Sequence, residues 1–579
     1  MARGPSIVVG LDFGTTFSGI AWALEGSVDE LEVISAWPGG GNRTSVKVPS
    51  VISYDGQRTY WGYQVRPFTE AFRGIKLLLD ESQEAKYTPS LASKVLLGKR
   101  KTNAVQVVAD YLKYLVEYVK SVLQRRFDIP AKDMDLRFTL TVPAVWSDTA
   151  KDRTLNAAIQ ADIRPQDITL VSEPEAAALY TLRSIQSNSM AQNDVFIVCD
   201  AGGGTVVRRY LIYHNTYAKN RQDLISYQIK TLEPLALVEV TEGTGRICGS
   251  MLLDQRFEKL LRDRMSVNYA TLSSKSKEAA LSYWQDRVKP NYTGKYDNDY
   301  ADIDYFIPLP GVADNPKIPI EDGFFQLSSD DVEDIFEPIV HDVEELIAEQ
   351  VAGITKLGFV TKAIVLVGGF GSSIYLLRRL QKKNPAVQQT QYTIKLLADV
   401  SRWSAVVSGA VYRGLEGNQV ECRVARRHYG IEFSAGYIPY THNAEDAYWD
   451  PLEERYKVNR MTWYLQKSSK ICENDPIKMD FYHTVRVKDA KEALSYSVDL
   501  HICNDTHAPE VKNNRTMRLC TLHSHLGKIP RKLFERKRNS RGVEYFKIPF
   551  KLVMIPTSAS LLFELEFEGV QYGCVRSKY

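Results

Sequence analysis

Two short segments of this chain combine an acidic residue at the end of an apolar run with a turn of small residues. Residues 7–16 read I-V-V-G-L-D-F-G-T-T, and residues 195–205 read V-F-I-V-C-D-A-G-G-G-T. Glycine lets the backbone approach an anion closely, and successive N–H groups at such a turn form an anion-binding concavity. Because a second run rich in apolar residues follows each turn, we interpret both segments as strand–turn–strand hairpins that bind phosphate.

The aspartate in each hairpin, Asp12 or Asp200, could hold the waters of a magnesium ion that neutralises phosphate charge. A single glycine-rich turn is weak evidence, since most such turns are ordinary tight hairpins. Two acid-containing copies in one chain favour a pair of hairpins that hold a triphosphate from both sides. A third segment, residues 362–373 (K-A-I-V-L-V-G-G-F-G-S-S), has a strand–turn–helix pattern in which a purine and ribose could lie.

The elements that would position these turns alternate between apolar runs and amphipathic helices as far as about residue 415, which is typical of α/β layers. The pattern predicts a helix over 107–127 and a buried strand over 137–144. A second long helix is expected to open at the N-cap run that begins at Ser328 (S-S-D-D) and to end near Leu357, before the C-cap glycine, Gly358.

The sequence pattern changes after about residue 416, where short alternating runs predict antiparallel strands with one solvated face. A chain of 579 residues also exceeds what a single core usually organises. We therefore expect one α/β domain over residues 1–416 and a β-rich domain over residues 420–579.

Composition excludes several classes of protein. Apolar residues make up 44% of the chain, charged residues 25%, and the net charge is only +3, so we expect no nucleic-acid partner. The basic run at 528–541 is interpreted as a solvated hairpin loop rather than a nuclear address. No stretch is long and apolar enough for a membrane span. The seven cysteines lack a C-x-x-C pair and suggest reduced core thiols, so we expect a cytoplasmic protein, with the nucleus as alternative.

Several of these motifs resemble those of the 70 kDa heat-shock chaperones. D-F-G-T-T is similar to the family's first phosphate motif, D-A-G-G-G-T to its second and L-V-G-G to its adenosine motif, while 141–144 (T-V-P-A) and 171–178 (V-S-E-P-E-A-A-A) resemble its hinge-side segments. The resemblance runs in order over about residues 5–415. It implies a duplicated actin-like (ribonuclease H-like) ATPase domain in two lobes, followed by a β-rich domain, with ATP or ADP and Mg²⁺ as cofactors.

The resemblance also implies roles for individual residues. Asp12 and Asp200 would hold the hydrated Mg²⁺, Glu173 would lie near the metal and the attacking water, and Lys76 would match the catalytic lysine. From local sequence alone, a surface lysine at the start of a helix explains Lys76 equally well. The residues with implied contacts to the nucleotide are Gly14, Thr15, Thr16, Gly202, Gly203, Gly204, Thr205, Gly249, Ser250, Gly368 and Gly369.

The sequence departs from the family pattern at three places. Val207 stands where the second phosphate motif normally carries another acid, which predicts slow or absent hydrolysis. The adenine-clamping string E-x-x-K-R is missing around 280–289, and there Trp284 is interpreted as a core aromatic rather than a base-stacking residue. A helical lid is also missing, so the chain looks like a lid-less branch of the family.

These patterns support three functions. The first is a chaperone-like protein that binds Mg-ATP between two lobes, hydrolyses it slowly and couples nucleotide state to its C-terminal domain, with a protein client or co-chaperone bound through 420–579. The second is a non-catalytic nucleotide-binding scaffold, which Val207 favours. The third is a small-molecule kinase on the same fold, for which no second acid is an evident base. In each, an adenine nucleotide is the expected ligand.

Overall fold

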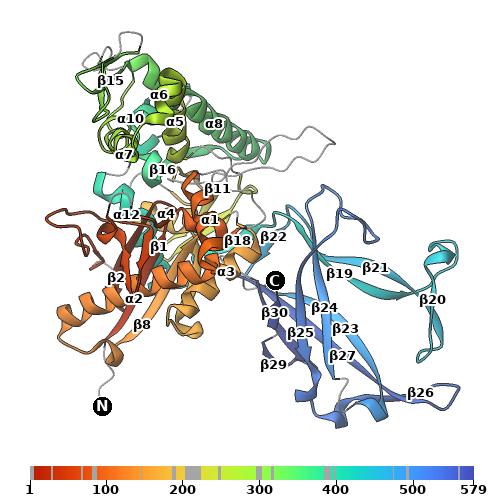
Figure 1. Cartoon of the computed structure of the whole chain (residues 1–579). Helices are drawn as coiled ribbons and strands as arrows, with labels where there is room; N and C mark the ends of the chain where they lie inside the picture. The colour runs from red at the N-terminus through yellow and green to blue at the C-terminus, as the bar shows by residue number, and fades with distance from the viewer. Residues whose placement is uncertain are drawn as a thin grey trace. The chain divides into compact units, whose positions relative to one another are not determined.

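The computed structural model describes residues 5–27, 30–66, 69–80, 88–144, 146–184, 191–202, 223–244, 249–294, 303–314, 318–383, 393–396, 399–473, 475–490, 494–557, 561–574 and 576–578. The chain divides into two compact units, Met1–Gln419 and Val420–Tyr579. Helices and strands alternate in the first unit, so the expected mixed α/β class is confirmed (Figure 1).

One sheet of the first unit has the strand order β3-β2-β1-β8-β9, with β4 paired to β2. β1 and β2 form an antiparallel hairpin, whereas β8 runs parallel to β1 and β9 parallel to β8. The apolar run of β1 is buried on both faces, which suits a central strand. The strands span Ser6–Phe13 (β1), Phe17–Leu24 (β2), Glu32–Val33 (β3), Val48–Pro49 (β4), Asp135–Val142 (β8) and Ile168–Ser172 (β9).

A second sheet of this unit repeats the same strand order. It contains β12-β11-β10-β16-β17, in which β10, β11 and β12 are antiparallel neighbours and β16 and β17 run parallel to β10. Each sheet therefore has three antiparallel strands followed by two parallel strands. The strands span Val195–Asp200 (β10), Asp223–Leu232 (β11), Leu235–Glu239 (β12), Thr361–Val367 (β16) and Thr393–Leu396 (β17).

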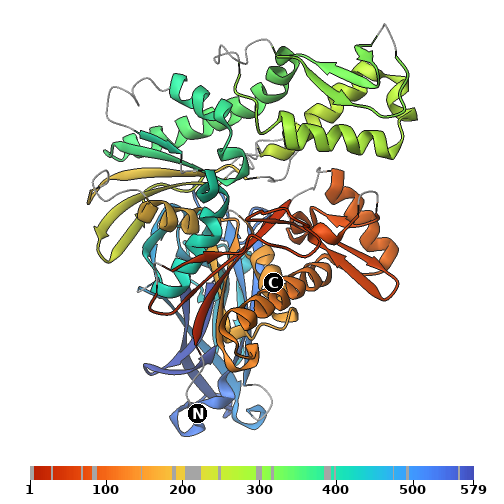
Figure 2. The same cartoon turned by 90° about the vertical axis from the view of Figure 1, so that its left-hand side faces the viewer.

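Each of these two sheets, together with the helices that accompany it in the chain, is called one half of the first unit. The helices of the two halves also correspond in position along the chain. A long helix precedes the first parallel strand, another helix connects the two parallel strands, and a third follows them. These helices are α2 (Ala104–Phe127), α3 (Asp148–Gln160) and α4 (Glu173–Ser184) in one half, and α8 (Ser329–Lys356), α10 (Ile374–Lys383) and α12 (Asp399–Glu416) in the other. Figure 2 shows the orange helix α2 against the red strands of the first sheet, consistent with the contact between Phe13 and Tyr111.

Each half carries an additional group of elements before its long helix. In the first half they are β5 (Val51–Asp55), β6 (Arg58–Trp61), β7 (Phe72–Arg73), the 3₁₀ helix η2 (Ile75–Leu79) and α1 (Thr88–Arg100). In the second half they are α5 (Ser250–Met265), α6 (Val267–Thr271), α7 (Ser274–Tyr283), η5 (Trp284–Val288), β13 (Tyr305–Pro308), β14 (Ile320–Glu321) and β15 (Phe324–Leu327).

The sequence signals for the two long helices are confirmed. Asn103 caps α2 by accepting a hydrogen bond from the backbone of Gln106. Ser328 caps α8 in a reciprocal pair with Asp331, and Gly358 follows the helix end with a φ of 82°. Side-chain caps satisfy N–H groups that the first helical turn leaves without partners, and glycine adopts a positive φ without steric cost.

Glycines bring α12 unusually close to its neighbours. A Cβ atom added at Gly409 would lie 1.7 Å from the carbonyl oxygen of Ala176 in α4, and one added at Gly414 would lie 2.4 Å from Cγ1 of Val8 in β1. On the β1 side, a Cβ atom at Gly10 would lie 2.5 Å from the carbonyl oxygen of Val407. Helix α12 therefore lies directly on β1 and α4, at distances that only glycine permits.

The second unit consists of antiparallel sheets. One has the order β20-β21-β19-β24-β25-β30, another the order β23-β27-β28-β29 with β26 paired to β27, and β18 pairs with β22. The two larger sheets share one apolar core, which includes Ile431, Phe481, Leu522 and Phe550. The strands span Val420–Val424 (β18), His428–Gly436 (β19), Tyr448–Asp450 (β20), Arg455–Leu465 (β21), Lys470–Cys472 (β22), Ile477–Arg486 (β23), Ser495–Cys503 (β24), Met517–His525 (β25), Glu535–Arg538 (β26), Glu544–Pro556 (β27), Leu561–Phe567 (β28), Val570–Cys574 (β29) and Arg576–Lys578 (β30).

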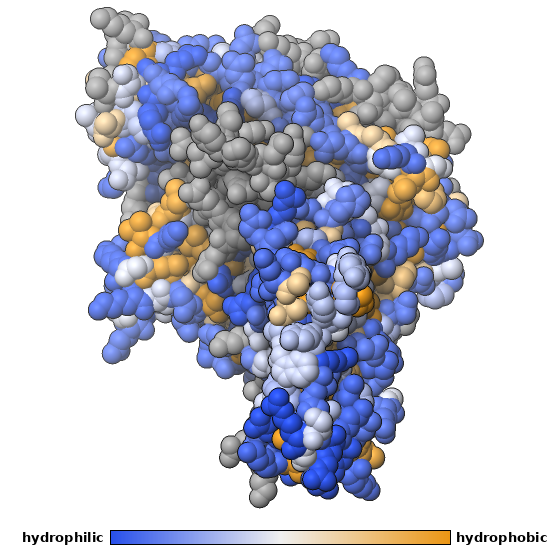
Figure 3. All heavy atoms as spheres, turned by 90° about the vertical axis from the view of Figure 1, so that its right-hand side faces the viewer, coloured by the Kyte–Doolittle hydropathy of each residue, from blue (hydrophilic) through white to orange (hydrophobic). Residues whose placement is uncertain are grey.

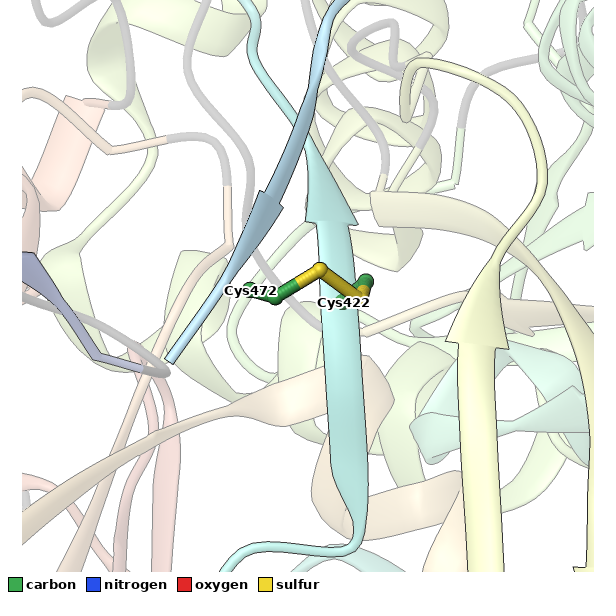
Figure 4. Close-up of a disulfide and its surroundings, with 2 residues drawn as sticks. All are labelled: Cys422 and Cys472. Atoms are coloured by element: carbon green, nitrogen blue, oxygen red, sulfur yellow. A yellow bond between two sulfur atoms is a disulfide. The ribbon is translucent and has the colours of Figure 1, made fainter. Parts of the chain in front are cut away.

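One pair of cysteines corrects the expectation that all seven are reduced core thiols. Cys422 in β18 and Cys472 in β22 are register partners and form a disulfide (Figure 4). They are 50 residues apart in sequence, so only the antiparallel pairing of the two strands brings them together. Cys199, Cys503 and Cys520 are buried free thiols, as expected.

Two other expectations concern the basic run at 528–541 and the absence of a membrane span. The basic run at 528–541 includes β26, which pairs with β27 as a hairpin, and its arginine Arg536 pairs with Glu544. Figure 3 shows a mainly hydrophilic face on which apolar residues form small, separate groups. Among the described residues, no helix has both the length and the apolar character that a membrane span requires.

Candidate functional site

The first acid-containing hairpin places Asp12 near the end of β1, where its carboxylate is buried and held by two donors. Lys47 Nζ donates to Asp12 Oδ2 at 2.8 Å, and the Thr141 hydroxyl donates to Asp12 Oδ1 at 3.0 Å. Burial raises the pKa of Asp12, but the charges of Lys47 and Lys76 and these two hydrogen bonds outweigh it, so the pKa is lowered. Asp12 is therefore ionised at neutral pH.

Lys76 lies inside the first unit rather than on its surface. It belongs to η2, and its side chain is 4% exposed. Its Nζ donates to Glu173 Oε1 at 2.6 Å and lies 5.5 Å from the ring centroid of Trp146. Of the two interpretations left open by the sequence, the surface lysine is wrong. Lys76 and Glu173, widely separated in sequence, form one buried ion pair.

The described part of the second acid-containing motif, which ends at Gly202, meets the glycine turn of the third motif. Asp200 is the last residue of β10, and the backbone N–H of Ala201 donates to the carbonyl oxygen of Val367 at 2.9 Å. In return, the N–H of Phe370 donates to the carbonyl oxygen of Ala201 at 2.8 Å. The N–H of Ser250, the first residue of α5, donates to the carbonyl oxygen of Gly202 at 3.3 Å.

The predicted residues line one cleft of about 1200 Å³ in the first unit. The site residues predicted from the sequence that line this cleft are Asp12, Gly14, Thr15, Thr16, Lys76, Glu173, Asp200, Gly202, Ser250, Gly368 and Gly369. Gly249 is the N-cap residue of α5 and is not part of the walls. Gly203, Gly204, Thr205 and Val207 lie outside the described residues. Residues from the first, second and third motifs are thus brought to the same cavity.

Beyond Ser250 the cleft continues along α5, α7 and η5. Asp254 accepts hydrogen bonds from Trp284 Nε1 at 2.9 Å, from Gln285 Nε2 at 2.9 Å and from Lys289 Nζ at 2.7 Å. Trp284 is fully buried and stacks on Phe257 with ring centroids 4.7 Å apart. The interpretation of Trp284 as a core aromatic is confirmed, and its neighbours Asp254, Gln285 and Lys289 are among the residues that line the cavity.

Sequence reasoning missed Lys47, which lines the cleft beside Asp12. It lies directly before β4, between two valines and close to Pro49, with no glycine or acid nearby to mark a site. The only signal was a lysine placed between apolar residues next to a strand. Such a residue is more often a solvated strand neighbour, so its role required the three-dimensional contacts.

Two glycines of the third motif, Gly368 and Gly369, should differ sharply in their tolerance of a side chain. At Gly368 φ is 82°, and a Cβ atom would lie 2.4 Å from Asp200 Oδ1, whereas at Gly369 the nearest atom, on Trp403, is 4.0 Å away. We expect Gly368→Ala to destabilise the chain by about 1 to 3 kcal/mol and Gly369→Ala by less than about 0.5 kcal/mol. Denaturant unfolding measures both, and equal losses would contradict the packing described for Gly368.

Fold and cleft together define a mixed α/β protein in which acids, lysines and glycine turns from two similarly ordered sheets converge on one cavity. No family model matches the chain. Heat shock 70 kDa protein 12A of Homo sapiens is 23% identical over 527 residues, which covers 76% of this chain and 74% of that protein. Heat shock 70 kDa protein 12B of Homo sapiens is 22% identical over 538 residues, covering 76% and 73%.

A further similarity concerns part of the chain. The chaperone protein HscA homolog of Shewanella piezotolerans is 29% identical over 217 residues, or 34% of this chain and 31% of that protein. Together with the longer matches, it shows that the chain is similar to divergent proteins of the heat shock 70 kDa family.

Proposed function

We propose that the chain is a chaperone-like protein that binds ATP or ADP with magnesium in the cleft of residues 1–416 and hydrolyses ATP slowly. The observation that carries this proposal is the convergence of Asp12, Asp200 and the Lys76–Glu173 pair on one cavity. Glycine turns from both sheets line the same cavity and offer backbone N–H groups to phosphate. The matching strand orders of the two sheets support a duplicated actin-like (ribonuclease H-like) fold in two lobes.

The acids of the cleft fit a hydrated magnesium ion. Asp12, Asp200 and Glu173 provide carboxylate oxygens, which Mg²⁺ prefers, and Mg²⁺ usually keeps several of its waters. Within the described ranges, no group of three or more histidine, cysteine or acidic side chains is close enough to hold a metal directly. Asp12, Asp200 and Glu173 therefore suit contacts with Mg²⁺ through its bound waters. When bound, the ion would offset phosphate charge, and Lys76 would hold Glu173 near the attacking water.

A negative charge introduced at Gly202 tests binding. Among the described residues, the nearest atom to a Cβ atom added at Gly202 is Asp200 Oδ1 at 3.9 Å, so this Cβ atom clashes with none of them. A glutamate would place negative charge at the proposed phosphate turn, and we expect Gly202→Glu to weaken ATP binding at least about tenfold by repulsion. Titration calorimetry with ATP, ADP and magnesium measures the change, and a phosphate-release assay follows on the same sample.

The matched control is Gly202→Ala, which adds the Cβ atom without the charge. We expect its affinity for ATP to stay within about threefold of the unsubstituted chain, a difference of less than 1 kcal/mol. If both variants bind ATP as tightly as the unsubstituted chain, the turn does not contact phosphate. If the unsubstituted chain binds neither ATP nor ADP, the proposed function is wrong.

The substitution of an acid by Val207 favours a second candidate, a nucleotide-binding scaffold without turnover. Phosphate release in the same assay distinguishes the two functions, since a scaffold binds ATP and releases none. The names of the relatives support a protein client or co-chaperone as partner, and we assign that contact to the β-rich residues 420–579. A change in nucleotide would then reach the partner through a shift between conformations of the chain.

A further inference from the structure

Lys47 is a cation built into the cleft. Its Nζ lies 2.8 Å from Asp12 Oδ2, and its side chain is 14% exposed. Asp12 is one of the acids proposed to surround a hydrated metal ion, and Asp200 and Glu173 line the same cleft as Lys47. A lysine ammonium group carries a positive charge at neutral pH.

The backbone of Lys47 is fixed relative to the first phosphate turn. Its carbonyl oxygen accepts hydrogen bonds from the Ser45 hydroxyl at 2.7 Å and from the Tyr63 hydroxyl at 3.1 Å. Three residues later, the N–H of Ser50 donates to the carbonyl oxygen of Thr16, in the turn itself, at 2.8 Å. These contacts hold the start of the Lys47 side chain in place, so that its amino group is directed to the acids without a large loss of entropy on binding.

A lysine in this position can supply part of the positive charge that a divalent ion would bring to the phosphates. An ammonium group is a compact point charge with three donors, and Asp12 engages one of them. The other two can be directed to phosphate oxygens in the same cleft. The charge of Lys47 also compensates Asp12, which would otherwise repel a polyphosphate when no metal is present.

We propose that Lys47 serves as a resident cation of the nucleotide site, that is, a positive charge of the protein itself that is present with or without magnesium. The chain would then bind ATP even without magnesium. This inference rests on the proposed function, because it concerns the same cleft and the same ligand. It assigns to Lys47 a positioning role toward phosphate that the motifs of the sequence do not mark.

The test compares ATP binding by calorimetry in magnesium and in EDTA. For the unsubstituted chain, we expect the affinity to fall by less than about tenfold when magnesium is removed. For Lys47→Met, which keeps the apolar stem, we expect a fall of about tenfold to hundredfold more than that, because a charged hydrogen-bonding group is lost. Lys47→Arg keeps the charge and should restore most of the metal-free binding.

Lys289→Met is the matched control, since Lys289 also pairs with an aspartate in this cleft, at 2.7 Å from Asp254. Lys289→Met can change the absolute affinity for ATP. The ratio of its ATP affinity in magnesium to that in EDTA should nevertheless equal the ratio for the unsubstituted chain. A structural ion pair at Lys47 would likewise leave this ratio unchanged in Lys47→Met, and that result would overturn the inference.

Failure of the inference and failure of the proposed function are distinguishable. If the unsubstituted chain binds ATP in magnesium but loses more than about a hundredfold in EDTA, Lys47 is not a resident cation and the proposed function stands. If it binds ATP in neither condition, the proposed function fails. The first comparison requires no variant, so a loss of more than about a hundredfold in EDTA overturns the inference even if Lys47→Met does not fold.

Discussion

Replacing Gly409 by alanine is expected to destabilise the first unit by about 3 kcal/mol or more. The added Cβ atom would lie 1.7 Å from the carbonyl oxygen of Ala176. That oxygen belongs to the backbone of α4, so relief requires α4 and α12 to move apart and to lose contacts with β1 and β8. Far-UV circular dichroism during denaturant unfolding measures the loss, because the α-helices of the described residues all precede residue 419.

Gly98→Ala is the matched control for this substitution. Gly98 lies on the exposed face of α1, and no described atom is within 4 Å of its added Cβ atom. Since alanine favours a helix over glycine, we expect this variant to be as stable as the unsubstituted chain or more stable by up to about 1 kcal/mol. An unfolding midpoint for Gly409→Ala equal to that of Gly98→Ala would show that α4 and α12 do not meet as described.

The second large effect is expected on turnover. Lys76→Met keeps the apolar stem but removes the ammonium group, which lies over the rings of Phe13 and Trp146 and pairs with Glu173. If Lys76 stabilises the reaction at the terminal phosphate, single-turnover hydrolysis should fall by about 10² to 10³-fold. Binding of ATP should change less than about tenfold, because the other groups that we propose to contact the phosphates remain.

Lys277→Met provides the comparison for hydrolysis. Lys277 lines the same cleft, but its Nζ lies over the ring of Tyr269 at 4.8 Å, away from the pair formed by Lys76 and Glu173. Its hydrolysis rate should stay within about threefold of the unsubstituted rate, a change below 1 kcal/mol in the barrier. Equal rates for Lys76→Met and the unsubstituted chain would contradict a catalytic role for Lys76 and favour the scaffold.

The regular elements near the cleft were largely predictable because their signals are local. The apolar run before Asp12 predicted β1, and the run before Asp200 predicted β10. The cap residue Ser328 marked the start of α8 within one residue. Such signals depend on hydrogen bonds and side-chain packing between residues that are neighbours in sequence, so a single sequence contains them.

The features that escaped prediction depend on contacts between distant segments. Lys76 looked the same as a surface lysine until η2 placed it against Glu173 from α4. Lys47 reaches Asp12 only because β4 pairs with β2. The disulfide between Cys422 and Cys472 depends on the register of β18 and β22. Local sequence does not reveal these contacts, since burial and charge partners are set by topology.

The glycine-lined face of α12 has a mechanical consequence. Although α12 ends the second half of the repeated order, its closest contacts are to β1 and α4 of the first half, while β16 and α9 (Gly368–Gly371) touch it as well. Atoms already at van der Waals distance cannot slide or compress without a steric penalty. Helix α12 must therefore move with the first sheet as one rigid body. Any opening of the cavity must then take place at the contacts of α12 with β16 and α9.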